Sequence, residues 1–253
     1  MEVHRHSHAS HGPKKFREYF LEFLMLFLAV TLGFFAENLR ENFADHKKEK
    51  GYVQSLVADL KEDTTMIANL ARANLKMTRG QDSLVTLLNN YEDTGALTRK
   101  SYRYYFLYTT NFAEMVFNDR TMSQLLNAGG MRFIEDQKIS DSIMDYNSVV
   151  KYVRAQGDAY NEYFKKTLDQ STAIFDFSFG RIQLDERYHV IPVMPAPKID
   201  FKLLTTDPAT LKKYANQLSL SKSILQGYII NLITAKMRAT SLIILLKKKY
   251  HLD

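Results

Sequence analysis

The segment from Phe23 to Ala36 reads FLMLFLAVTLGFFA, fourteen residues without a charged side chain. Extended back to Tyr19 it admits only Glu22. At about 1.5 Å per residue the extended helix measures roughly 27 Å, and a hydrocarbon core of about 30 Å accepts that length with slight local thinning. We therefore predict a transmembrane anchor over residues 16–37.

Two alternative interpretations of this segment are less consistent with the sequence. A cleaved signal peptide needs small residues before the cut, and Phe34 and Ala36 match that requirement poorly. A buried core helix is the other alternative, but an apolar surface nearly all the way round the helix favours lipid. The anchor is therefore expected to remain uncleaved.

The orientation of the anchor is predicted from basic residues, because cytoplasmic flanks carry an excess of Lys and Arg. That count is tied, with four basic residues on each side. The residues before the segment are Arg5, Lys14, Lys15 and Arg17, and those after it are Arg40, Lys47, Lys48 and Lys50. We favour a cytoplasmic His-rich tail, residues 1–15, with the large domain on the opposite side of the membrane.

One face of the predicted span carries small residues at helical spacing. We call its five members the transmembrane interaction face: Glu22, Leu26, Ala29, Gly33 and Ala36. Ala29 and Gly33 form a small-xxx-small pair, which permits close approach of a second helix in lipid. A carboxyl group on the same stripe favours a protein partner over lipid. The face predicts helix–helix association; the alternative is a chance pair, with Glu22 reaching the membrane interface.

The rest of the chain predicts an all-α fold. Residues 38–52 continue as a polar helical stalk, and residues 53–253 form a bundle of four or five long helices, because apolar residues recur at steps of three and four. Four of the five prolines fall between residues 177 and 208, which predicts an irregular insert. Within it, residues 181–193 form either a short strand or hairpin or a packed loop.

Turn and capping residues divide the predicted bundle. Asn118 or Asp119 is expected to cap a short helix that Gly129 and Gly130 end, and Gly80 is a plausible helix break. The other expected helix starts are Asp136 and Asp207-Pro208. The final helix carries an uninterrupted apolar run of only five residues, Leu242 to Leu246, so it is not predicted to be a second span. The aromatic-rich stretch from Thr98 to Phe117 is predicted to pack in the core rather than to stack on nucleic acid.

The composition limits the chemistry available. The chain has 253 residues, no Cys, and 34 Lys and Arg against 28 Asp and Glu. Disulfides, thiolate metal sites and cysteine nucleophiles are therefore excluded, and so mild a basic excess argues against a nucleic-acid partner. The sequence contains no HExxH pair, no Gly-rich phosphate loop and no G-x-S-x-G elbow. We predict no metal site and no cofactor.

Three groups of polar residues are candidate sites. The tail histidines His4, His6, His8 and His11 lack the fixed geometry that a specific metal site needs. Carboxylates such as Asp59, Glu62 and Asp63 are expected on helix surfaces. The densest polar group on a predicted loop is Asp185, Glu186, Arg187 and His189, which keeps an enzyme as the weakest alternative.

Three stretches carry a resemblance to a known family. They are the opening MEVHRHSH with KKFREYFLEFLMLFLAVTLGFFAENLRE, the central DRTMSQLLNAGGMRFIEDQKISDSIMDY, and the ending LIILLKKKYHLD. Together they resemble a family of single-pass inner-membrane proteins from Bacteroidota with a helical extracytoplasmic domain. The resemblance implies a bacterial inner-membrane protein with its helical domain in the periplasm. It implies no activity, and no site residue is carried over from it.

The sequence therefore predicts an envelope protein that acts by interaction, as a scaffold or sensor, and not by an evident catalytic step. Its partners are expected to be the lipid bilayer and either another protein or a second copy of itself. The alternative is an accessory subunit of a membrane enzyme or transporter, docked through the transmembrane interaction face.

Overall fold

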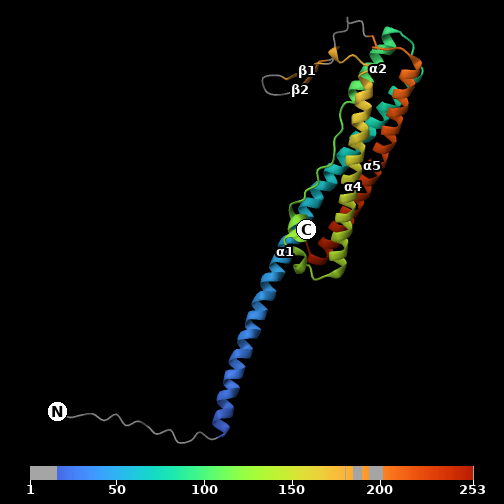
Figure 1. The fold of residues 1–253 in the computed structure, drawn as a ribbon. Helices are drawn as coiled ribbons and strands as arrows, with labels where there is room; N and C mark the ends of the chain where they lie inside the picture. Colours follow the sequence, from blue (N-terminus) through green and yellow to red (C-terminus); the bar gives the residue numbers. More distant parts are fainter. Residues whose placement is uncertain (1–15, 180, 185–189, 194–201, 253) are drawn as a thin grey trace, which may run out of the picture. The chain divides into compact units, whose positions relative to one another are not determined.

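The computed structural model describes residues 16–179, 181–184, 190–193 and 202–252 (Figure 1). The chain divides into two compact units, residues 1–51 and residues 52–253. The fold is all-α with five helices, as the apolar periodicity predicts. Three of them are long: α1 (Phe16–Asn89), α4 (Gln137–Ser171) and α5 (Pro208–Tyr250). The other two, α2 (Gly95–Tyr108) and α3 (Arg120–Asn127), are short, so the expectation of four or five long helices overstates their length.

Helix α1 continues through Gly80, where the sequence predicts a possible break. A Cβ atom at this position would clash with ring atoms of Tyr108, at the end of α2. Glycine is therefore present because the Tyr108 ring packs directly on the backbone of α1, and not because the helix ends there. The helix ends instead at Asn89.

The turn after α3 depends on two adjacent glycines. Gly129 has a φ of 74°, a left-handed conformation that glycine adopts without steric cost. A Cβ atom on Gly130 would lie 2.8 Å from the carbonyl oxygen of Gln124 and 2.9 Å from the Cα atom of Leu125. Gly130 opens the 3-10 helix η1 (Gly130–Phe133), so both glycines are needed to turn the chain tightly out of α3.

Both long C-terminal helices start at the residues predicted from the sequence. Asp136 accepts a hydrogen bond from the backbone N–H of Ile139 and caps α4, and Asp207 accepts one from Thr210 and caps α5, with Pro208 in its first turn. Helices α4 and α5 pack side by side (Figure 1). They are antiparallel, as two ion pairs along their length show: Arg238 with Asp145 at 3.2 Å, and Lys249 with Asp136 at 2.7 Å.

The Pro-containing insert includes a small hairpin. Strand β1 (Arg181–Leu184) pairs antiparallel with β2 (Val190–Val193), with Arg181 opposite Val193 and Leu184 opposite Val190. The hairpin is one of the two alternatives that the sequence leaves open here. A 3-10 turn, η2 (Phe177–Phe179), precedes it.

The core of residues 52–253 consists of two apolar clusters. The larger cluster joins residues of α1, α3, α4 and α5, including Leu56, Ile143 and Leu232. The smaller cluster lies around the predicted aromatic stretch: Tyr105 is fully buried and its ring stacks on that of Phe175 with centroids 4.1 Å apart. These aromatic side chains therefore pack in the core, as expected.

Candidate functional site

The N-terminal part of α1 holds the segment predicted to cross a membrane. It contains an 18-residue window that is long and apolar enough to span, and 0% of that window is buried within the protein. Within it the rings of Phe23 and Phe27 stack with centroids 6.2 Å apart, and the Thr31 hydroxyl donates to the Phe27 carbonyl at 2.8 Å. The only polar side chain in the middle of the segment is thus satisfied by its own helix. By length and composition, this part of α1 is a candidate membrane anchor or signal segment.

The transmembrane interaction face lies open on this helix. All five of its residues are exposed, and Leu26 retains 67% of its surface. Around Gly33 no atom lies within 4 Å of the position that a Cβ atom would take. Larger side chains are therefore accommodated at Gly33 within one copy of the chain, which makes this position a clean test of contacts with a second helix.

Helix α5 also contains an 18-residue window apolar enough to span a membrane, but 33% of that window is buried. Core helices of water-soluble domains pass the same test of length and composition. The buried residues Leu232, Ala235, Ala239 and Leu242 belong to the larger core cluster. The inward face of α5 is therefore used for packing in the bundle.

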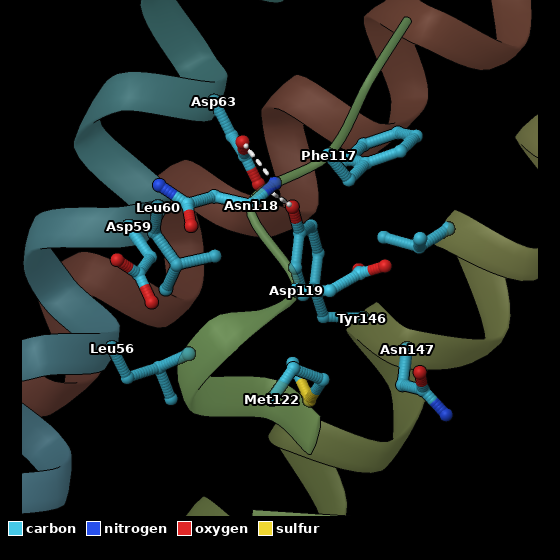
Figure 2. Close-up of a pocket in the computed structure, with 11 residues that line it drawn as sticks. Leu56, Asp59, Leu60, Asp63, Phe117, Asn118, Asp119, Met122, Tyr146 and Asn147 are labelled. Carbon is cyan, nitrogen blue, oxygen red and sulfur yellow. Dashed lines mark hydrogen bonds between the residues drawn. The ribbon is translucent and has the colours of Figure 1, made fainter. Parts of the chain in front are cut away.

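A second site of interest is a buried carboxylate pair on α1, at the contact of α1 with α4 and the segment before α3. Asp59 and Asp63 are only 2% and 3% exposed. Asp63 accepts a hydrogen bond from the Tyr146 hydroxyl at 3.1 Å and one from the Asn118 backbone N–H at 3.0 Å (Figure 2). One carboxylate thus joins α4 and the segment before α3 to α1.

Asp59 holds the start of α3. It accepts hydrogen bonds from the Arg120 guanidinium at 2.7 Å and from the Thr121 backbone N–H at 3.2 Å, and the Thr121 hydroxyl also donates to it. Asp119 occupies the predicted N-cap position of α3, but its side chain makes no capping bond and pairs instead with Arg154 of α4. The helix start is predicted correctly, whereas the group that caps it comes from α1.

The expectation that Asp59 and Asp63 lie on a helix surface is wrong. Apolar residues of α1 face the core at Leu56, Leu60 and Ile67, and Asp63 continues the same steps of four, three and four residues. An acidic residue in register with the buried positions is the signal that identifies a buried carboxylate. Glu62 is out of register and is exposed, and its carboxylate accepts from the Asn118 side chain at 3.0 Å.

Burial dominates the electrostatics of this pair. Burial raises the pKa of Asp63 above its ordinary value, the two hydrogen bonds from Asn118 and Tyr146 oppose that rise, and the nearby negative charges of Asp59 and Asp119 add to it. Burial and the adjacent Asp63 carboxylate raise the pKa of the Tyr146 hydroxyl. Tyr146 therefore stays protonated at neutral pH and can donate its hydrogen bond to Asp63.

The space beside the pair is too small for a substrate. The cavity lined by Asp59, Asp63, Phe117 and Tyr146 has a volume of about 10 Å³ (Figure 2), which is room for about one water molecule. With its acceptors occupied by groups of the chain, the pair fixes α3 and the segment before it against α1. Its role in the part of the chain that the structure describes is to organise the fold.

Other predicted polar groups are outside the described residues. The tail histidines His4, His6, His8 and His11 and the loop residues Asp185, Glu186, Arg187 and His189 all fall there. Among the residues described, no group of three or more His, Asp or Glu side chains is placed to hold a metal ion.

Comparison of the chain with protein-family models, with curated proteins and with solved structures finds no match. The class that the geometry defines is an α-helical bundle preceded by a long apolar N-terminal helix. The resemblance to the Bacteroidota inner-membrane family remains a prediction from the sequence.

Proposed function

We propose that this protein is a membrane-anchored helical protein of the bacterial envelope that acts by binding another protein. The observation that carries the proposal is the 18-residue apolar window of α1, none of which is buried by the chain itself. Leaving so large an apolar surface in water is unfavourable, at about 25 cal/mol per Å² of exposed apolar area. Insertion into a bilayer removes that cost.

The proposed topology has residues 1–15 in the cytoplasm and residues 53–253 in the periplasm, with one span of the inner membrane. Because the count of flanking basic residues is tied, the topology is tested separately from the anchor. The bundle serves as a scaffold or sensor.

A second candidate function is an accessory subunit of a membrane enzyme or transporter. The open surface at Gly33 favours it, since a small residue with no intrachain neighbour within 4 Å allows close approach of another helix. In this function the transmembrane interaction face docks against a partner span.

Fractionation of cells that express the full chain tests the anchor. We expect the protein in the inner-membrane fraction, resistant to extraction at alkaline pH, with the bundle digested by protease only after the outer membrane is opened. Extraction at alkaline pH would overturn the anchor, and protection of the bundle in spheroplasts would overturn the topology. Native mass of the detergent-purified complex then separates the functions, because an accessory subunit requires one partner in fixed ratio.

A further inference from the structure

The outward face of α5 carries a row of exposed apolar side chains. Ile230, Ile233, Met237 and Ile244 are 63%, 47%, 65% and 63% exposed. Their spacing of three, four and seven residues places three of them at successive a positions and Ile233 at a d position of a heptad, the seam through which two helices pack. The next two d positions are Thr240 and Lys247. We call these four residues the α5 outer stripe. Since the opposite face of α5 is buried in the core, this helix is apolar on two sides.

All charged side chains of helix α5 are basic. Its 43 residues include eight Lys and Arg and no Asp or Glu. Three of the basic residues pair with carboxylates of other helices, namely Lys222 with Asp82, Arg238 with Asp145 and Lys249 with Asp136. Among the residues that the structure describes, the remaining five have no carboxylate partner: Lys212, Lys213, Lys236, Lys247 and Lys248.

Two of these lysines flank the α5 outer stripe directly. With Ile230 at position a of the heptad, Lys236 falls at g and Lys248 at e, and both are exposed. The exposed residues at the other e positions, Thr234 and Ser241, are uncharged. Charges at e and g set the choice and orientation of a partner helix. The edges of this seam are therefore neutral or positive along its whole length.

We propose that the α5 outer stripe is a docking surface for an acidic amphipathic helix of a partner protein, with apolar residues on its seam and Asp or Glu beside them. The inference rests on the proposed function, in which the bundle binds another protein, and it names the surface and the chemistry of that partner. The match is made by charge, because only a negative helix complements the lysines at both edges.

Two other occupants fit this surface less well. A second copy of the chain would bring together two α5 helices that contain no Asp or Glu, so Lys236 and Lys248 would gain no carboxylate partner from the facing helix. A membrane surface favours a broad apolar face with aromatic residues. The α5 outer stripe is instead narrow and bordered by Thr234 and Ser241. Of the aromatic residues of α5, Tyr214 and Tyr228 are buried in the core and Tyr250 is partly buried against it.

Photo-crosslinking in native membranes tests the proposal. The full chain with Met237→p-benzoylphenylalanine is expected to crosslink to one protein, through a peptide with acidic residues beside an apolar heptad. The control is Leu107→p-benzoylphenylalanine on α2, where the native side chain is 53% exposed. Lys236→Glu with Lys248→Glu should lower the crosslink yield by at least about fivefold. The matched reversal, Lys212→Glu with Lys213→Glu, should leave it unchanged.

The remaining outcomes overturn the proposal. An acidic helix is excluded if position 237 crosslinks to a second copy or to lipid, or gives no crosslink. It is also excluded if position 107 crosslinks equally well, or if the yield does not change when Lys236 and Lys248 are reversed. Failure of the anchor is seen separately, because extraction at alkaline pH reports on α1 and is independent of crosslinking at α5.

Discussion

The Tyr146 hydroxyl donates a hydrogen bond to the Asp63 carboxylate at 3.1 Å, joining two residues 83 positions apart in the sequence. Both side chains are buried, at 3% exposure each. Tyr146→Phe removes the donor and leaves Asp63 with only its bond to Asn118. We expect the free energy of unfolding to fall by about 1–2 kcal/mol, measured by urea denaturation in mild detergent. A loss below the error of that measurement would contradict the assigned role of this bond.

The raised pKa of Asp63 predicts a specific pH dependence of stability. Because the folded state binds the Asp63 proton more tightly than the unfolded state, protonation of Asp63 stabilises the fold. This contribution to the free energy of unfolding is largest below pH 3.8, the ordinary pKa of Asp, and is lost as the pH rises through the raised pKa of the folded state. Asp63→Asn cannot titrate, so the stability of the wild type relative to this variant should fall across that window and level off above it. A constant difference between wild type and Asp63→Asn would show that burial leaves this pKa unchanged.

Removal of the Asp59 side chain should be more costly than the loss of a surface ion pair. Asp59→Ala leaves the Thr121 N–H and hydroxyl without their acceptor and frees Arg120, so we expect a loss of about 3 kcal/mol. Asp82→Ala, which breaks the more exposed pair with Lys222, should cost no more than about 1 kcal/mol. Equal losses in chemical denaturation would show that Asp59 does not cap α3.

A methyl group at Gly130 should destabilise the bundle, because it meets the backbone of α3 and not a movable side chain. The contacts of 2.8 Å and 2.9 Å with Gln124 and Leu125 can be relieved only by moving the turn. We expect Gly130→Ala to lower the melting temperature, with a cost of about 1–3 kcal/mol. Gly227→Ala is the matched control: its Cβ meets no atom within 4 Å, and within a helix it should add about 0.5–1 kcal/mol of stability. An unchanged melting temperature for Gly130→Ala would argue against a tight turn.

The transmembrane interaction face is tested by a bulky residue at its centre. In membranes, Gly33→Ile should abolish crosslinking of the chain to a second copy or to a partner, because the added side chain separates the helix backbones. Thr31→Ile places the same side chain near the opposite side of the helix and should leave association intact. If both variants behave like the wild type, helix–helix association does not use this face.

The sequence predicts the helices of this fold well because their signals are local. Asp136 and Asp207 lie directly before the helices that they cap, and the apolar steps of α1 identify its buried face. Gly80 misleads because its neighbour, Tyr108, is distant in sequence, so a packing glycine resembles a helix break.

The buried carboxylates were missed for a related reason. The partners of Asp59 and Asp63 lie 55 to 83 residues away in the chain. The apolar register of α1 indicates that these carboxylates are buried, but no local pattern identifies their partners. The residues of the transmembrane interaction face are exposed, as an anchor requires, but exposure alone does not identify what they contact, so that face remains a prediction.

The capping of α3 by Asp59 also determines when this helix can form. With eight residues and no side-chain cap of its own, α3 is far too short to persist as an isolated helix in water. The bonds that stabilise its first turn require closure of a loop 62 residues long between Asp59 and Thr121. We therefore expect α3 to form only after its contact with α1, and its amides to exchange with solvent together with any opening of that contact.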